Sequence, residues 1–254
     1  MRITAYKSPL VGVGDDLWQI LAATLPDKLE EHCVVAVTSK IVSLCQGRAE
    51  KIPSDGKKAR ARKVELTKAE ADQWILGSET YQVYLTLKNH CLVPTSGIDE
   101  SNSGGYFLLW PEDVQRVAEE IWRWLRKKYG VKEVGVIITD SHTIMLKWGV
   151  VGMALAWCGF VGVRSKIGDK DLFNHEFVMT KINDAESLAM AAVYEMGETN
   201  EQTPVAVVSE LKEVIWQTRV PDAAELQESY IEPTDDLYGK LIGGVKWEPG
   251  GGGV

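Results

Sequence analysis

The chain has 254 residues, of which 45% are hydrophobic and 25% are charged. This composition is typical of a globular protein and excludes the collagen-like, disordered and membrane-embedded classes. Acidic residues outnumber basic residues by 36 to 28, which leaves a net charge of −8 and argues against a protein that coats nucleic-acid backbones. We therefore expect no nucleic-acid partner, although one nucleotide can still bind where metal ions supply positive charge.

Targeting signals are not apparent in the sequence. The first ten residues contain no apolar segment of the signal-peptide type. The most apolar run, residues 150–163, is too short to span a bilayer. The four cysteines form no C-x-x-C pair and are expected to be reduced, buried thiols. The sequence predicts a cytoplasmic protein with no membrane partner.

Strands and helices alternate along the chain without internal repeats. In chain order, the patterns predict a strand at 2–6, a helix at 15–25, a buried strand at 33–37, a polar and mainly helical stretch at 49–80, strands at 81–87 and 105–109, a helix at 111–129, a strand at 133–139, a helix at 184–196 and a strand at 204–208. We expect a mixed α/β (α+β) fold with one domain over residues 1–247. The glycine-rich residues 248–254 have little apolar surface to bury and are expected to be disordered.

Three polar turns carry the candidate chemistry. They lie at residues 96–104, 139–141 and 196–201 and contribute Asp99, Asn102, Asp140, Ser141 and Glu198. Asp140 follows a buried strand, and ligands in α/β sheets gather at the carboxyl ends of strands. Each turn taken alone also fits an ordinary capped turn or a solvated loop. Taken together, three oxygen-rich turns suit a hard cation such as Mg²⁺ or Mn²⁺.

Standard nucleotide and zinc motifs are missing from the sequence. The chain contains neither a Walker A motif nor a dinucleotide-binding glycine fingerprint, and its four histidines lack the spacing of zinc ligands. A bound nucleotide would therefore be held by an unconventional set of residues.

Several specific motifs occur in order along the chain, which reads Ser-Lys-Ile-Val-Ser at 39–43, Gly-Ile-Asp-Glu-Ser-Asn at 97–102, Leu-Leu-Trp-Pro-Glu-Asp at 108–113 and Ile-Ile-Thr-Asp-Ser at 137–141. Taken together, these motifs resemble the F420-0:gamma-glutamyl ligase family, which comprises coenzyme F420:L-glutamate ligases. The resemblance covers nearly all of the first 210 residues, and the block at 97–102 is its most specific part.

This resemblance implies a fold, an activity and a set of cofactors. The fold would be F420 ligase-like, with mixed sheets and flanking helices in one domain or two intertwined subdomains, and the chain would form a homodimer. The activity would be a GTP-dependent ligase that joins L-glutamate to a carboxylate of a coenzyme F420 precursor or a related acceptor through an acyl phosphate. Two divalent ions per site, Mg²⁺ or Mn²⁺, would assist, and K⁺ is a further candidate.

The same resemblance assigns roles to individual residues. Asp99 and Asp140 are candidate catalytic and metal-binding residues, and Ser141 and Glu198 are the remaining candidate metal ligands. The candidate nucleotide-binding residues are Ser8, Pro9, Leu10, Val11, Ser39, Lys40, Asn102, Met196, Gly197, Glu198, Thr199, Asn200, Glu201, Gln202 and Thr203.

Two segments depart from the family pattern. The family usually has a lysine where this chain has Leu44, and it usually reads Thr-Phe-Gly-Arg-Pro-Trp-Arg where this chain has residues 141–147 without an arginine. Arginine is well suited to clamp phosphate or carboxylate groups, so these changes bear on the acceptor. A folate-type acceptor and a non-catalytic nucleotide- and metal-binding homologue are therefore the alternatives.

Overall fold

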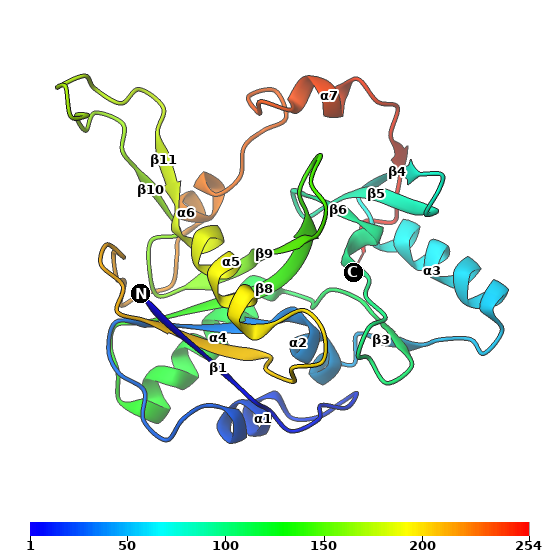
Figure 1. Cartoon of the computed structure of the whole chain (residues 1–254), viewed down its shortest axis with the longest axis horizontal. Helices are drawn as coiled ribbons and strands as arrows, with labels where there is room; N and C mark the ends of the chain where they lie inside the picture. Colours follow the sequence, from blue (N-terminus) through cyan, green and yellow to red (C-terminus); the bar gives the residue numbers. More distant parts are fainter. Residues whose placement is uncertain (254) are drawn as a thin grey trace.

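A computed structural model describes residues 1–253 of the chain. Its centre is a five-stranded sheet in the order β1-β12-β2-β8-β9 (Figure 1). The five strands are β1 (Arg2–Tyr6), β2 (Cys33–Thr38), β8 (Val134–Thr143), β9 (Val150–Cys158) and β12 (Val205–Ser209). β2 and β8 run parallel, and the other neighbours are antiparallel. The four predicted strands of this sheet are confirmed, whereas β9 was not predicted.

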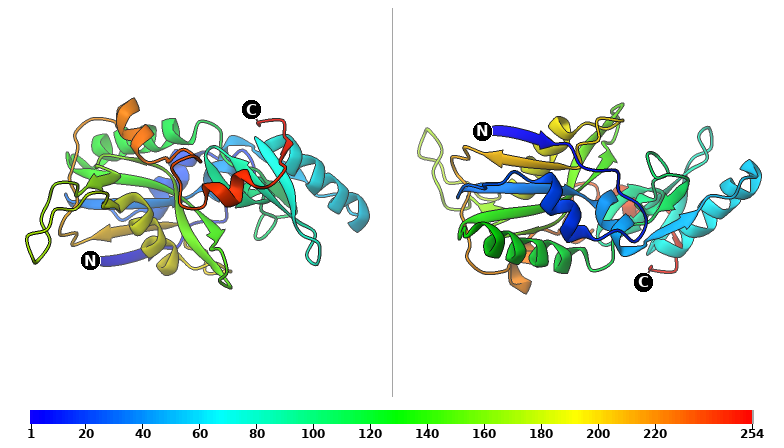
Figure 2. Two further views of the ribbon diagram at one scale, coloured as in Figure 1. Left: turned by 90° about the horizontal axis from the view of Figure 1, so that it is seen from above. Right: turned by 90° about the horizontal axis from the view of Figure 1, so that it is seen from below.

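Helices cover both faces of the central sheet. α1 (Leu17–Thr24) and α4 (Val114–Tyr129) pack on one face and α5 (Asp184–Met196) packs on the other (Figure 2). The alternation of side chains along β2 explains this arrangement, because Val35 and Val37 point towards α1 and α4 while Val34 and Ala36 point towards α5. The strand is buried on both faces, as its continuous apolar run indicates.

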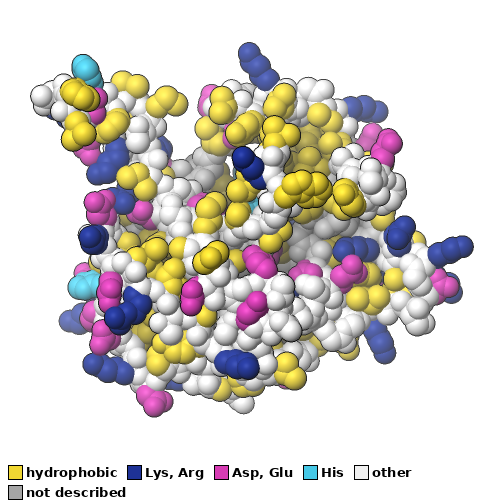
Figure 3. Space-filling view, viewed as in Figure 1, with side chains coloured by type: hydrophobic (Ala, Val, Ile, Leu, Met, Phe, Trp, Pro, Cys, Tyr) yellow, Lys and Arg dark blue, Asp and Glu magenta, His cyan; other side chains and the backbone are white. Residues whose placement is uncertain are grey.

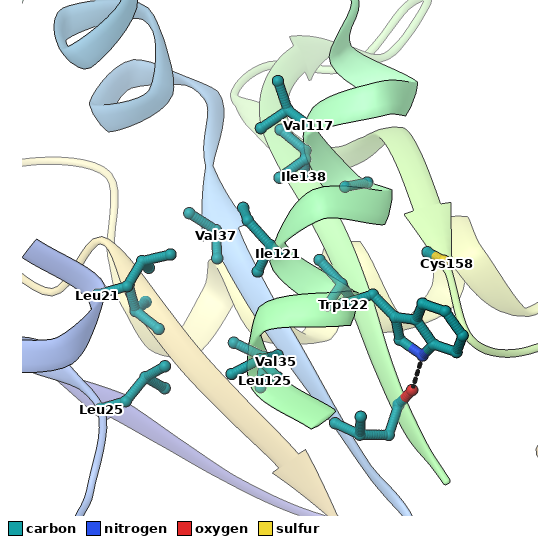
Figure 4. Packing of buried hydrophobic residues seen from close by; sticks show 14 of the residues in the cluster. Leu21, Leu25, Val35, Val37, Val117, Ile121, Trp122, Leu125, Ile138 and Cys158 are labelled. Atoms are coloured by element: carbon teal, nitrogen blue, oxygen red, sulfur yellow. Dashed lines mark hydrogen bonds between the residues drawn. The ribbon is translucent and has the colours of Figure 1, made fainter. Parts of the chain in front are cut away.

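The packing between α4 and the sheet is dense and includes one buried polar contact. Leu125 and Ile121 of α4 meet Val35 and Val37 of β2 (Figure 4). The indole N–H of Trp122 donates a hydrogen bond of 2.9 Å to the backbone carbonyl of Val134 (Figure 4). A buried indole N–H needs such a partner, so the helix is fixed against β8 by a specific bond as well as by apolar contact.

A smaller sheet forms beside the central one, in the order β13-β4-β5-β6. Its strands are β4 (Gln73–Ser78), β5 (Val83–Lys88), β6 (Cys91–Pro94) and β13 (Glu248–Pro249). The remaining elements of this region are α2 (Ser39–Gln46), the pair β3 (Ala49–Lys51) and β7 (Tyr106–Leu108), α3 (Gly56–Glu70) and a 3₁₀ turn at Thr95–Gly97. The expectation that residues 49–80 are mainly helical is therefore too broad, because β3 and β4 flank α3 and gain partners distant in sequence.

The rest of the chain projects from or wraps around this body. β10 (Val163–Ser165) and β11 (Lys181–Asn183) form the base of a long hairpin that extends from one corner (Figure 1). Two short helices, α6 (Ala223–Glu228) and α7 (Gly239–Gly243), lie on the segment that returns to β4. Within residues 1–253, every helix is too short or too polar to cross a bilayer. The mixed α/β (α+β) fold is confirmed.

The expectation of a disordered tail is wrong for residues 248–253. β13 pairs with β4, and the indole N–H of Trp74 donates to the carbonyl of Pro249 at 3.1 Å. The backbone N–H groups of residues 250–253 then donate to carbonyls at the end of α3 and at Asp72. A Cβ atom added at Gly250 would lie 2.0 Å from the carbonyl oxygen of Ala71, so the glycines permit this close approach. Backbone hydrogen bonds replace the apolar burial that the tail lacks.

Candidate active site

One cavity of about 540 Å³ lies where loops from both sheets meet. Its walls come from the segment after β1, the junction of β2 and α2, the 3₁₀ turn and the loop that follows it, the middle of β8, and the connection from α5 to β12. The three polar turns identified in the sequence therefore line a single cavity. Of the sequence-predicted residues, the cavity is lined by Ser8, Pro9, Leu10, Val11, Lys40, Asp99, Asn102, Asp140, Ser141, Met196, Gly197, Glu198, Thr199, Asn200, Gln202 and Thr203.

Asp140 occupies a half-buried position in the wall of this cavity. β8 continues to Thr143, so Asp140 lies within the strand and not at its end as expected. The parallel pairing with β2 nevertheless stops at Thr139, and the antiparallel pairing with β9 shifts register between Ile138 and Thr139. Asp140 is therefore the first residue beyond the parallel ladder, which is the position where a sheet presents ligands.

Two N–H groups hold the carboxylate of Asp140. The backbone N–H of Ser141 donates to Oδ1 at 2.9 Å, and the indole N–H of Trp110 donates to Oδ2. Burial raises the pKa of Asp140 to about 6, and the negative charge of Asp99 adds to this effect, although the two hydrogen bonds oppose it. The charge of Asp140 is thus incompletely compensated in the protein alone.

Asp99 pairs with Lys40 across the cavity. The ammonium Nζ of Lys40 lies 2.7 Å from Oδ2 of Asp99 and also donates to the carbonyl of Ser101 at 3.1 Å. Burial acts to raise the pKa of Asp99, but the ion pair with Lys40 and the hydrogen bonds from Ser101 outweigh it, so this pKa lies below its ordinary value. Asp99 therefore stays ionised at neutral pH.

The turn after α5 brings a third carboxylate to the cavity. The hydroxyl of Ser141 donates to both oxygens of Glu198, at 2.8 and 3.0 Å. The side-chain amide of Asn102 donates to the carbonyl of Thr199, which joins this turn to the loop that carries Asp99. Gly197 has a φ of 80°, which lets the helix end and the chain reverse at this point. These contacts connect all three polar turns directly.

A helix N-terminus also faces the cavity. α2 begins at Ser39 immediately after β2, and its N-cap Thr38 makes no side-chain capping bond. The first-turn N–H groups of α2, with Lys40 beside them, form an arrangement that favours anions such as phosphate. Ser39 itself is buried and does not line the cavity, whereas Thr38 and Lys40 do.

Two backbone segments close the opposite side of the cavity. The N–H of Ser8 donates to the carbonyl of Gln202 at 3.1 Å, and the side-chain amide of Gln202 donates to the carbonyl of Ser8 at 2.7 Å. Glu201 does not line the cavity. Its carboxylate instead accepts from the backbone N–H and the hydroxyl of Thr199, both at 2.8 Å. Glu201 thus stabilises the turn through hydrogen bonds without lining the cavity.

Sequence reasoning missed the roles of Trp110 and Gly97 in the cavity wall. Trp110 contacts Asp140, and Gly97 packs against the Trp110 indole so closely that an added Cβ would lie 2.0 Å from Nε1. The tryptophan was visible in the sequence as part of a family-like block, but nothing in the pattern paired it with Asp140.

Leu44 also lines the cavity and is almost fully buried. The wall is therefore apolar where the family usually has a lysine.

A divalent cation bound by these carboxylates would need ligands from other groups as well. Asp99, Asp140 and Glu198 share one cavity, and Lys40 is its single lining Lys or Arg side chain within residues 1–253. No three His, Cys, Asp or Glu side chains of these described residues are close enough to form a closed metal cage. Mg²⁺ and Mn²⁺ do not need such a cage, because they accept one or two carboxylates and complete their shell with water and phosphate oxygens.

The raised pKa of Asp140 predicts a specific pH dependence of stability in metal-free protein. The folded state holds the proton more tightly than the unfolded state, whose aspartate pKa is about 3.9. The free energy of unfolding contributed by this group therefore falls as pH rises from about 4 through 6, and it is constant only above about pH 7. Across this pH window the wild-type chain should lose up to about 3 kcal/mol more unfolding free energy than the Asp140→Asn variant loses. Urea unfolding in a chelating buffer measures this loss, and a constant difference between the two proteins would contradict it.

Known proteins are similar in sequence to this chain over most of its length. Residues 6–210 match the family model for F420-0:Gamma-glutamyl ligase. The chain is 33% identical over 206 residues to the coenzyme F420:L-glutamate ligase of Methanopyrus kandleri, which covers 76% of this chain and 80% of that protein. It is 30% identical to the coenzyme F420:L-glutamate ligase of Archaeoglobus fulgidus over 246 residues, or 92% and 94% of the two chains. It is 32% identical to the Methanosarcina barkeri protein of the same name over 220 residues, or 81% and 84%. The chain therefore belongs to the F420-0:gamma-glutamyl ligase family.

Proposed function

We propose that this chain is a ligase that uses GTP to form an amide bond between L-glutamate and a carboxylate of a coenzyme F420 precursor. Membership of the family supports glutamate ligation, since the similar proteins are named as coenzyme F420:L-glutamate ligases. The observation that carries the proposal is the convergence of Asp99, Asp140 and Glu198 on one cavity beside Lys40 and the N-terminus of α2. This combination suits a metal-bound triphosphate.

The proposed metal ligands are Asp99, Asp140, Ser141 and Glu198. When bound, two Mg²⁺ or Mn²⁺ ions, with K⁺ as a further candidate, would neutralise the charge of the triphosphate. The protein alone leaves Asp140 with a raised pKa, which supports the assignment because a bound cation would compensate its charge.

The other lining residues would orient the nucleotide. Lys40 provides a point charge for a phosphate oxygen, and the first-turn N–H groups of α2 donate to the same anionic group. The two segments that Ser8 and Gln202 join would enclose the remainder of the nucleotide. Because backbone hydrogen bonds already fix these segments, little conformational entropy is lost on binding.

The proposed reaction has two steps. A carboxylate oxygen of the acceptor attacks the γ-phosphorus of GTP, so that an acyl phosphate forms and GDP leaves. The neutral amine of L-glutamate then attacks the acyl carbon and the amide bond forms. Inorganic phosphate leaves with the electron pair of the broken C–O bond, and the proton that the nitrogen loses passes to the leaving phosphate or to water. The contribution of the protein is to hold the reacting groups together and to stabilise the charge on the phosphates.

Two projecting hairpins support a homodimer as the working unit. The β10–β11 hairpin exposes Leu172 and Phe173, and yellow hydrophobic side chains gather on this projection in Figure 3. The connection between β8 and β9 exposes Leu146 and Trp148, each more than nine-tenths accessible. Large apolar side chains rarely remain exposed on isolated hairpins, and a second copy of the chain would bury them.

The test of the function is ligation by the purified full-length chain. It is incubated with GTP, Mn²⁺, isotope-labelled L-glutamate and the glutamate-free coenzyme F420 precursor, and the products are measured by mass spectrometry. We expect the acceptor to gain glutamyl residues while GTP becomes GDP and phosphate. If glutamate is added to a folate and not to the F420 precursor, the folate is the acceptor and the F420 precursor is not. Tight GTP binding without a product on either acceptor would contradict the proposal and indicate a non-catalytic homologue.

A further inference from the structure

The turn at Thr95–Gly97 has a strained backbone beside the candidate active site. Its three residues have consecutive positive φ angles of 49°, 54° and 71°. Glycine adopts this left-handed region freely, whereas residues with a Cβ atom are strained there, β-branched ones such as threonine most of all. Thr95 and Gly97 line the cavity, and Ser96 between them is completely buried. A conformation of this kind persists only where the surrounding contacts enforce it.

Two hydrogen bonds made by Ser96 enforce the left-handed turn. Its hydroxyl donates to the backbone carbonyl of Thr67, near the end of α3, at 2.7 Å. Its backbone N–H donates to the hydroxyl oxygen of Thr86 on β5 at 2.9 Å. The Thr86 hydroxyl in turn donates to the carbonyl of Val93 on β6 at 2.7 Å. Ser96 and Thr86 are both fully buried, so water cannot replace these bonds when one is lost.

The turn determines where Gly97 lies, and Gly97 packs directly against the Trp110 indole. A Cβ atom added at Gly97 would lie 2.0 Å from Nε1 and 2.3 Å from Cε2 of this indole. Val93 of β6 packs in the same buried cluster as Trp110. The indole N–H donates to Oδ2 of Asp140. A change in the turn would therefore move the donor that holds the Asp140 carboxylate.

Asp99 follows the same turn but is fixed by other contacts. Its backbone N–H donates to the carbonyl of Leu108 at 3.0 Å, and the N–H of Leu108 donates back to the carbonyl of Asp99 at 2.7 Å. Loss of the Ser96 bonds should thus act on Asp140, through Trp110, and leave the backbone of Asp99 in place.

We propose that Ser96 is a positioning residue for the candidate active site, with Thr86 as its partner. Their hydrogen bonds hold the left-handed turn. The turn places Gly97 against the Trp110 indole, and the indole orients the carboxylate of Asp140. Ser96 does not line the cavity, so it acts through this series of contacts. The effect on ligation rests on the proposed function, whereas the effect on the Trp110 indole does not.

A double-mutant cycle tests whether Ser96 acts through Trp110. Ser96→Ala should lower kcat for glutamate ligation about tenfold, as expected for loss of a group that supports a metal ligand indirectly. Trp110→Phe removes the indole N–H, and Ser96→Ala added to it should cause no further loss, because both changes act on one contact. The proposal is overturned if the two losses multiply in the double variant, or if Ser96→Ala has the kcat of the wild type.

The Trp110 indole N–H provides a measurement that does not depend on ligation. In a proton–nitrogen correlation NMR spectrum of the metal-free, full-length chain, the indole resonance that is missing from Trp110→Phe belongs to this group. A strong hydrogen bond to a carboxylate moves such a proton downfield, so Ser96→Ala should shift the resonance upfield. An unshifted resonance would overturn the proposal. If the chain proves inactive as a ligase, the upfield shift still supports the positioning role, so the two proposals fail separately.

A pair of Thr86 variants keeps the test valid if Ser96→Ala folds poorly. Thr86→Val removes the acceptor of the Ser96 N–H and should reproduce the effects of Ser96→Ala on kcat and on the indole resonance. Thr86→Ser keeps a hydroxyl and should restore both to the wild-type values. Equal behaviour of the two Thr86 variants would contradict the proposal, because the hydroxyl would then not be required.

Thr24→Val is the matched control for loss of a buried hydroxyl. Thr24 is buried on α1, does not line the cavity, and donates to the carbonyl of Ile20 at 2.7 Å. Whatever its effect on the melting temperature, this variant should leave kcat and the Trp110 resonance unchanged. A loss of kcat in Thr24→Val equal to that in Ser96→Ala would show that Ser96 acts through stability alone.

Discussion

Substitution of Asp140 by asparagine is expected to lower the rate of glutamate ligation by about 1,000-fold, a loss typical of removing a directly acting charged group. Asparagine retains the shape of the side chain but removes its charge. It also provides one acceptor oxygen in place of two, so it can accept from Trp110 or from Ser141 but not from both. A cation held by Asp140 would lose its charged ligand, while the buried strand β8 keeps its packing.

The measurements for Asp140→Asn are kcat, the affinity for Mn²⁺ and the melting temperature. We expect a large fall in kcat and weaker Mn²⁺ binding with a folded protein. Asp27→Asn is the matched control, because Asp27 is exposed and does not line the cavity, and it should retain full activity. Activity of Asp140→Asn within tenfold of the wild type would remove Asp140 from the reaction centre.

Most of the central sheet could be predicted from the sequence because its elements are strongly patterned. β2 is a continuous apolar run, and α5 begins and ends at the predicted residues 184 and 196. The elements that were missed depend on distant partners. β4 is half-exposed and forms a strand because it pairs with β5 and β13. β13 itself contains only two residues. Local propensity cannot identify strands of this kind.

In the candidate site, too, the local patterns could be predicted from the sequence and the tertiary contacts could not. The acidic turns could be identified because carboxylate, amide and hydroxyl side chains gather in them, although each turn taken alone also fits an ordinary loop. Their convergence could not be derived from spacing, since Ser141 and Glu198 are 57 residues apart and are joined by a hydrogen bond in the folded chain. The pairing of Trp110 with Asp140 is also a tertiary contact, and it depends on the absence of a side chain at Gly97.

Replacement of Trp110 by phenylalanine is expected to reduce kcat by 10- to 100-fold, the usual cost of losing a group that orients a metal ligand. Phenylalanine fills much of the buried space that Trp110 occupies but has no N–H to donate to Oδ2 of Asp140. Trp110 is thus a positioning residue, since it acts through Asp140. The KM for GTP should change little, because Lys40 and α2 are untouched, while the affinity for Mn²⁺ should fall with kcat.

Trp122→Phe is the matched control for this variant. Trp122 is equally buried and also donates its indole N–H, in this case to the carbonyl of Val134 in the core between α4 and the sheet. We expect both variants to lose about 1–2 kcal/mol of unfolding free energy, because each leaves a small void and an unpaired acceptor. Only Trp110→Phe should lose kcat and Mn²⁺ affinity. Equal losses of kcat in the two variants would show that Trp110 acts through stability alone and that its bond to Asp140 does not orient the carboxylate.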